Sequence, residues 1–264
     1  MPTVMIYSIL LLLGAAVGSF LNVCIFRIPK NESIVFPVSH CQACQHPIAW
    51  RDNIPVVSFF VLKGRCRHCH APISSQYVWV EVSGIVLFLL FYFVFGLTVR
   101  GAVYLILSLA LLTESLIDWK HQIIPDGITL SGIVIGLAVS GLFPELHGES
   151  VWFKGLLSAG LGVLLGGGVL YALGTVSEWI MKKETMGGGD VKLLAMIGAV
   201  LGWKGVFGTL LVSSFVGSAV GIFLRWRRGQ EKIPFGPYLA LGAFLYLFFG
   251  QQMMDAYLGL FKLS

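Results

Sequence analysis

Long apolar segments dominate this 264-residue chain and restrict its fold more than any other feature. A helix of about 20 apolar residues is long enough to cross a hydrocarbon core ~30 Å thick. Hydrophobic residues make up 56% of the chain and charged residues only 12%, about half of the usual ~25%. A chain of this size cannot enclose so much apolar surface in one core, so we expect an all-α polytopic membrane protein.

We expect about eight transmembrane helices, at approximately 4–26, 80–97, 101–118, 123–142, 155–181, 190–203, 206–224 and 237–260. The sixth is interrupted early, by the residues at 202–205, and a short or re-entrant helix is an open alternative there. The first segment is expected to be a retained helix, because no small-residue cleavage site followed by a soluble domain comes after it.

The distribution of basic residues predicts the orientation. Lys and Arg are retained on the cytoplasmic side of membrane proteins. Fourteen of the 18 basic residues fall in four loops on one side (six, one, three and four residues), with Lys192 assigned to the third loop. Those loops lie at about 27–79, 117–126, 182–189 and 225–236. We therefore place these loops in the cytoplasm. The net charge of +5 follows from this topology and from anionic lipid, and nucleic acid is not an expected partner, because no basic stripe with interleaved aromatic residues is present.

One soluble insert, at 27–79, separates the first helix (1–26) from an expected membrane domain at 80–264. It contains two C-x-x-C pairs with 21 residues between them, formed by Cys41, Cys44, Cys66 and Cys69. Four thiolates in two such pairs suit tetrahedral Zn²⁺. We expect a structural zinc site whose binding contributes to the folding of a segment too small for a large core.

The alternatives for these cysteines are redox-active pairs, inert thiols, and a zinc site with one histidine ligand. Redox-active pairs are disfavoured because neither pair has a βαβ context, and a reducing cytoplasm disfavours structural disulfides. A histidine could replace one thiolate, and the nearby candidates are His40, His46, His68 and His70. Cys24, at the end of the first apolar segment, is expected to be a packing residue.

Two aspartates lie at the predicted cytoplasmic edge of the membrane. Asp118 ends the third apolar segment and Asp190 opens the sixth, after Gly187, Gly188 and Gly189. Carboxylates at membrane depth are costly and mark functional sites. Two facing carboxyl groups that share a proton can activate water and protonate a scissile carbonyl, as in aspartic proteases. The glycines permit close approach of an extended substrate. From its place at a helix N-terminus, Asp190 is expected to be the ionised member.

These residues belong to a set of five motifs that resembles the type IV prepilin peptidases, which are membrane aspartic enzymes. GSFLNVCIFRIP (18–29) is similar to the opening signature of the family, and the insert to its two-knuckle domain. Asp118, Pro125 and Asp126 fit D-x6-PD, and Gly187 to Asp190 fit G-x-G-D. IPFGPYLALGA (233–243) is also similar to the family. The G-x-G-D motif alone is weak, but five motifs in this order are specific.

The resemblance implies an endopeptidase in the bacterial cytoplasmic membrane that removes the short basic leader from type IV prepilin and pseudopilin precursors. It implies that Asp118 and Asp190 are catalytic. The insert is typical of the bifunctional members, which also methylate the new N-terminus with S-adenosylmethionine. No methyltransferase loop is visible in the sequence, so methylation rests on the resemblance alone.

Two other function classes fit the residues without the resemblance. Paired intramembrane carboxylates also relay protons in transporters, although no symmetry between 1–132 and 133–264 supports that class. A zinc-bearing membrane scaffold without catalysis is the second alternative. It predicts that loss of either aspartate leaves function intact.

Overall fold

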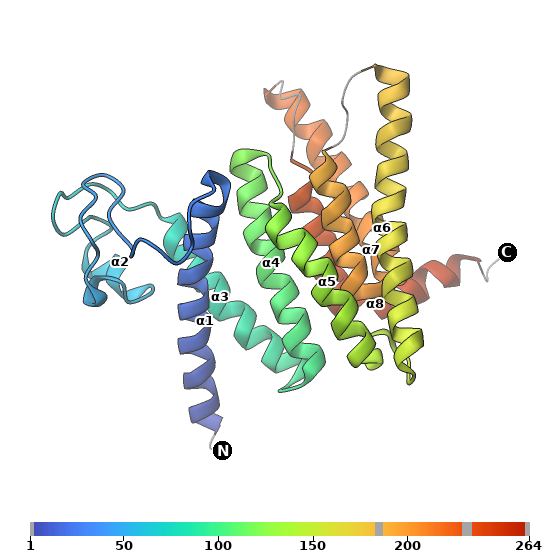
Figure 1. Ribbon diagram of the computed structural model, residues 1–264, viewed down its shortest axis with the longest axis horizontal. Coiled ribbons are helices and arrows are strands. Elements are labelled where there is room, and N and C mark those ends of the chain that lie inside the picture. Colours follow the sequence, from blue (N-terminus) through green and yellow to red (C-terminus); the bar gives the residue numbers. More distant parts are fainter. Residues whose placement is uncertain (1–2, 183–186, 229–233, 262–264) are drawn as a thin grey trace. The chain divides into compact units, whose positions relative to one another are not determined.

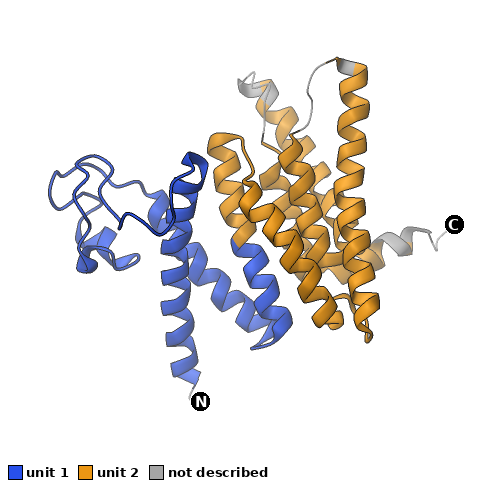
Figure 2. Ribbon diagram, viewed as in Figure 1, with its two compact units in different colours: residues 1–109 blue, residues 110–264 orange. Residues whose placement is uncertain are grey.

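The computed structural model describes residues 3–182, 187–228 and 234–261, so the predicted loops at 182–189 and 225–236 lie partly outside the described residues. Within these ranges the chain is helical and has no β-strand, only two isolated bridges. The predicted all-α class is therefore confirmed (Figure 1). The chain forms two compact units, residues 1–109 and 110–264, as Figure 2 shows.

The first unit is built on two long helices, α1 (Thr3–Arg27) and α3 (Gln76–Phe95), which pack closely against each other. Small residues make this possible: a Cβ atom at Gly18 would lie 2.6 Å from Cα of Glu81. Between them the insert carries only η1 (Ile28–Lys30), η2 (Trp50–Asp52) and the short α2 (Val57–Val61). The backbones of α1 and α3 are therefore in close contact at Gly18 and Glu81.

The second unit contains the end of α4 (Val99–His121) and the remaining helices. These are α5 (Asp126–Leu142), η3 (Pro144–His147), α6 (Trp152–Met181), α7 (Gly188–Arg228) and α8 (Gly236–Phe261). Helix α7 packs against α5, α6 and α8, and its residues Leu193, Leu194 and Ile197 are fully buried. The central position of α7 places Asp190, near its first residue, among the ends of the neighbouring helices.

The observed helices correspond to the predicted segments with one difference. Segments 190–203 and 206–224 belong to the long α7, which is broken at Gly202, where φ is 69°. The left-handed conformation at this position favours glycine because it carries no Cβ. Among the described residues, five helices are long and apolar enough to cross a membrane, and α5 is a shorter apolar helix. The chain is thus a multi-pass membrane protein, and the count of eight spans stays a prediction.

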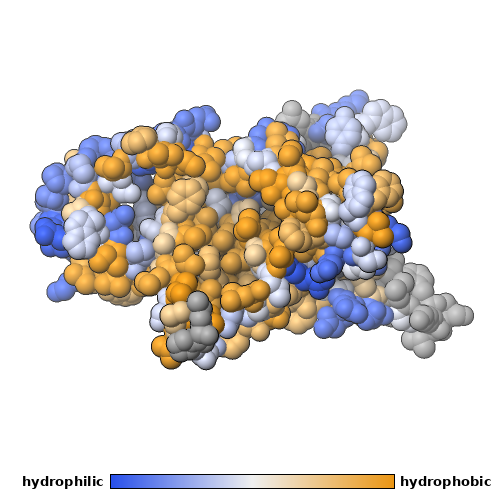
Figure 3. All heavy atoms as spheres, turned by 60° about the horizontal axis from the view of Figure 1, so that its bottom comes forward, coloured by the Kyte–Doolittle hydropathy of each residue, from blue (hydrophilic) through white to orange (hydrophobic). Residues whose placement is uncertain are grey.

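Large apolar side chains cover the outer faces of the helices. Leu12, Phe93, Leu164 and Phe215 each expose at least 70% of their surface. Figure 3 shows hydrophobic residues over much of the visible face of the helices. An aqueous surface does not carry so many exposed apolar side chains, whereas lipid solvates them.

Candidate functional site

Four helix ends in the second unit surround Asp118. Asp118 lies in the last turn of α4, and Ile124 lies in the segment that leads into α5. Asp190 is in the first turn of α7, and Gly236 is the first residue of α8. A Cβ atom at Gly189 would lie 2.9 Å from Cβ of Ile124, and one at Gly236 would lie 3.3 Å from its Cδ1. The side chain of Ile124 thus contacts the starts of both α7 and α8.

Asp118 is 5% exposed and has a backbone donor. The amide N–H of Gly236 donates to its Oδ2, at 3.1 Å. The first N–H groups of a helix have no partner within the helix, and the helix dipole favours a negative charge near them. The start of α8 therefore supplies both a hydrogen bond and a favourable field to this carboxyl group. The sequence prediction missed this contact, since 118 residues separate the two positions.

The glycine segment before Asp190 holds its backbone in place. Its amide N–H donates to the carbonyl oxygen of Gly187, at 3.1 Å. Its Oδ1 is buried and has no hydrogen-bond partner among the described residues. The carboxyl groups of Asp118 and Asp190 interact electrostatically. The structure thus brings together the two aspartates that the sequence singled out, although 71 positions separate them in the chain.

The predicted glycines differ in their surroundings. A Cβ atom at Gly187 would lie 3.4 Å from Oδ2 of Asp190, and Gly189 contacts Ile124. At Gly188 a Cβ atom would meet nothing within 4 Å. Gly187 therefore borders the carboxyl group of Asp190, Gly189 packs against Ile124, and Gly188 faces open space.

Three further charged groups lie near the aspartates. Glu114, one turn before Asp118 on α4, is 1% exposed, and neither of its carboxyl oxygens has a hydrogen-bond partner among the described residues. Lys192 on α7 forms an ion pair with Asp126 on α5, with 2.6 Å between Nζ and Oδ1. This pair is exposed and joins the starts of two helices, so its contribution to stability is small.

The chemistry available at this site is that of a carboxyl pair. One member has a backbone donor and the other has an unpartnered oxygen, so their surroundings differ. Two carboxyl groups in unlike environments can hold one proton between them and divide the roles of acid and base. Within the described part of the second unit, no cysteine or histidine cluster that could hold a metal lies beside them.

The four cysteines of the insert also come together. The Sγ atoms of Cys41, Cys44, Cys66 and Cys69 all lie within 4.8 Å of one another. Such a set fits the tetrahedral thiolate site of Zn²⁺, in which each sulfur lies ~2.3 Å from the ion. The cluster could therefore bind zinc with four thiolates. The rings of His46 and His68 instead contact each other, tilted by 40° and with their centroids 3.6 Å apart.

The two cysteine loops repeat the same backbone pattern. The N–H of Cys41 donates to the carbonyl of His46, and the N–H of Cys66 donates to that of Ala71. Gln45 and His70, at equivalent positions, both have positive φ, 58° and 56°. The repeated sequence C-x-x-C-x-x-P-I, at 41–48 and 66–73, could have revealed this duplication. Each loop presents two sulfurs in the same way, which gives the cluster approximate two-fold symmetry.

Ionisation of the thiols depends on their neighbours. The amide N–H groups of Cys44 and Ala43 donate to the Cys41 thiolate and lower its pKa to about 6. At Cys69 the N–H of Ala71 favours the thiolate, but desolvation and the neighbouring thiols outweigh it and raise the pKa to about 11. Four thiolates at this spacing therefore need a cation to offset their charge.

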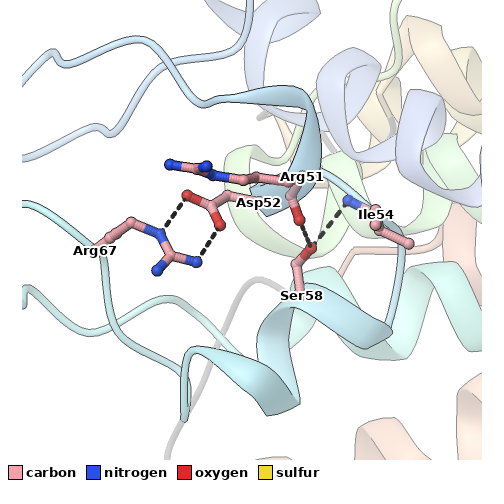
Figure 4. A network of polar contacts seen from close by, with 5 residues as sticks. All are labelled: Arg51, Asp52, Ile54, Ser58 and Arg67. Carbon is pink, nitrogen blue, oxygen red and sulfur yellow. Dashed lines mark hydrogen bonds and ion pairs between the residues drawn. The ribbon is translucent and has the colours of Figure 1, made fainter.

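An ion pair ties the second cysteine loop to the middle of the insert (Figure 4). The guanidinium of Arg67 donates from Nε and Nη2 to the two carboxylate oxygens of Asp52, at 2.7 and 2.6 Å. The same hydrogen bonds lower the pKa of Asp52. Close by, the Ser58 hydroxyl accepts from the N–H of Ile54 and donates to the carbonyl of Arg51. The bidentate Arg67–Asp52 pair and the hydrogen bonds of Ser58 together fix the segment 51–58. Within this segment, the N–H of Val56 donates to the carboxylate of Glu81.

Comparison with protein families identifies both parts of the chain. The model for the Bacterial Peptidase A24 N-terminal domain matches residues 12–95. The model for the Type IV leader peptidase family matches residues 105–222. The first match contains the insert and its cysteines, and the second contains Asp118 and Asp190. No solved structure matches the chain.

Relatives from three bacteria match over nearly the whole chain, and each is named a prepilin leader peptidase/N-methyltransferase. The protein from Pseudomonas aeruginosa is 36% identical over 94% of this chain and 92% of its own length. That from Stutzerimonas stutzeri is 34% identical, with the same two coverages, 94% and 92%. That from Aeromonas hydrophila is 35% identical over 96% of this chain and 93% of its own length. On this likeness, the chain belongs to the type IV leader peptidase family.

Proposed function

We propose that this protein is a membrane aspartic endopeptidase that removes the leader from type IV prepilins and pseudopilins and then methylates the new N-terminus. The observation that carries the peptidase proposal is the meeting of Asp118 and Asp190 at the ends of α4 and α7. The names of the relatives support both activities. Paired carboxyl groups also fit a transporter and the cysteine cluster also fits a scaffold, but the names of the relatives favour the peptidase over both classes.

The surroundings of the two aspartates suggest a division of roles. Asp118 accepts the N–H of Gly236 at a helix start, and this contact favours a negative charge on Asp118. Asp190 has a buried oxygen with no donor among the residues that the structure describes, so it is the better place for the shared proton. We therefore reverse the assignment that the helix positions alone had suggested, because the donor on α8 could not be seen in the sequence.

Cleavage then follows the general course of aspartic proteolysis. Asp118 takes a proton from a water molecule as the water oxygen attacks the scissile carbonyl, and Asp190 gives its proton to the carbonyl oxygen. The tetrahedral intermediate collapses when Asp118 returns its proton to the leaving amine. Asp190 recovers a proton from the hydroxyl group that becomes the new carboxyl group. No covalent intermediate with the enzyme is needed.

The topology proposed from the basic residues fits such a substrate. With the basic loops in the cytoplasm, both aspartates lie at the cytoplasmic face of the bacterial inner membrane. The basic leader of a prepilin would stay in the cytoplasm while its apolar helix lies in the lipid bilayer. Gly187, which borders the carboxyl group of Asp190, and Gly188, where a Cβ atom would meet nothing within 4 Å, leave room for the extended backbone at the cleavage site.

Two cofactors belong to the proposal. Zn²⁺ would be held by Cys41, Cys44, Cys66 and Cys69 and would stabilise the insert, which has little core of its own. S-adenosylmethionine, when bound, supplies a methyl group activated by a sulfonium ion.

Replacement of Asp118 or Asp190 by Asn should each lower kcat/KM for leader removal by roughly 10³-fold or more, because neither variant can exchange the shared proton. The measurement is cleavage of a prepilin by purified enzyme in lipid nanodiscs. Asp255→Asn, an exposed residue of α8 far from the pair in sequence, is the matched control and should cleave normally. Near-normal cleavage by either Asp118→Asn or Asp190→Asn refutes the dyad.

Gly236→Ala should lower the cleavage rate by about tenfold or more, because the added Cβ would lie 2.7 Å from Oδ2 of Asp118 and would displace it from its donor. Gly127→Ala makes the same change in the first turn of α5, where a Cβ meets nothing within 4 Å. Initial rates of the two variants in the same assay decide the matter. Equal rates would mean that the start of α8 does not position Asp118.

Purified protein should contain one zinc ion per chain, and replacing Cys66 and Cys69 together by Ser should remove it, since two thiolates cannot hold the ion in place of four. Elemental analysis by mass spectrometry measures the metal. Cys24→Ser, which removes a buried thiol of α1 outside the cluster, should leave the zinc content unchanged. A wild-type protein without zinc, or a double variant that retains it, contradicts the assignment.

A further inference from the structure

The first unit contains a large cavity between the insert and the cytoplasmic ends of α1 and α3, as the proposed topology places them. Its volume is about 610 Å³, within the range of roughly 300–1,000 Å³ typical of small-molecule sites. Residues of three segments line it: Asn22 and Arg27 of α1, Val56 of the insert, and Tyr77 and Glu81 of α3. All of them lie in the unit that does not contain the two aspartates.

The cavity holds buried charges of both signs that do not pair with each other. Glu81 is 7% exposed and Arg27 is 9% exposed. The guanidinium of Arg27 donates to the carbonyls of Ser33 and Pro37, at 3.0 and 2.7 Å, and not to a carboxylate. Among the described residues, Glu81 takes part in no ion pair. Buried charges are costly unless they have a partner of opposite sign.

Glu81 is held in place by the backbone of the insert. Its Oε2 accepts the N–H of Val56, at 2.7 Å, and Ser19 of α1 also donates to the carboxylate. Val56 has φ of 62° and ψ of −53°, an unfavourable conformation for a β-branched residue. Backbone strain of this kind is typical of functional sites. The insert thus fixes a carboxylate at the wall of the cavity rather than in the packed interior.

One oxygen atom in the wall of the cavity has no hydrogen-bond partner among the described residues. The amide nitrogen of Asn22 donates to the carbonyl of Tyr77, at 3.0 Å, but its buried Oδ1 has no donor in that part of the chain. Beside it, the rings of Phe26 and Tyr77 stack with their centroids 5.0 Å apart. The cavity therefore offers a free acceptor next to an aromatic wall.

We propose that this cavity binds the methyl donor S-adenosylmethionine, with Glu81 as the partner of its cationic part and Arg27 as the partner of its carboxylate. The molecule carries a sulfonium and an ammonium group, one carboxylate, and an adenine ring. Each has a counterpart in the cavity: a carboxylate, a guanidinium, a free amide oxygen and an aromatic wall. This inference rests on the proposed methylation, and it names the site that the sequence could not locate.

Binding of radiolabelled S-adenosylmethionine to the full-length protein in nanodiscs tests the site without a methylation assay. Glu81→Gln should weaken binding about tenfold or more, since it removes a buried charge. Glu32→Gln removes an exposed carboxylate from the same cavity and should change the affinity by less than about threefold. Glu81→Gln should still remove leaders, which shows that it is folded, and Asp190→Asn should bind the donor normally.

Photochemical labelling of the wild type gives a second test that needs no substitution. Ultraviolet irradiation with the labelled donor should attach it to peptides from 19–27, 39–58 or 76–81. Label in residues 110–264, or equal affinity of Glu81→Gln and wild type, overturns the assignment of the cavity while leaving the peptidase proposal intact. Wild-type protein that binds no donor refutes the proposed methylation as well.

Discussion

The burial of carboxyl groups among apolar helices is the constraint on which the second unit depends. A carboxylate removed from water needs donors or a shared proton. Here the donor comes from the start of α8, where the N–H of Gly236 meets Asp118, and the neighbouring carboxyl group comes from the start of α7. Glycines let these helix starts come close to their neighbours: a Cβ at Gly236 of α8 would lie 2.7 Å from Oδ2 of Asp118, and one at Gly189 of α7 would lie 2.9 Å from Cβ of Ile124. The site is therefore a product of how closely the helices pack.

The first unit also depends on close packing at glycines, but it must in addition hold together an insert with little core. Its insert has little apolar core, so four cysteines and the Arg67–Asp52 pair hold its loops. Gly18 and Gly84 let α1 and α3 approach each other, and this contact places Glu81 beside Ser19. Hydrogen bonds of Asp52 and Ser58 fix the segment that contains Val56, and the N–H of Val56 donates to the carboxylate of Glu81. In our proposals one unit cuts the peptide bond and the other binds the methyl donor.

Much of this arrangement could be predicted from the sequence, because its signals are local. Apolar length predicted the helices, and C-x-x-C spacing predicted the cluster in which Cys41 meets Cys69. Contacts between distant segments could not be predicted: nothing near Asp118 in the chain indicates Gly236, and nothing near Glu81 indicates Val56. The domain boundary that we expected at residue 80 stays a prediction. The two compact units of the structure are a different division of the chain, and they meet within α4. The repeated C-x-x-C-x-x-P-I could have been read from the sequence and was missed.

The position of the scissile bond tests the central claim most directly. A prepilin with a photoreactive amino acid beside its cleavage site can be irradiated with the Asp190→Asn enzyme, which should bind the precursor without cutting it. Mass spectrometry then identifies the attached peptides. Our account predicts attachment near Ile124, in the glycine segment at 187–189, or at the start of α8. Attachment confined to the insert at 27–79 would contradict it, because the cleavage site would then lie away from both aspartates.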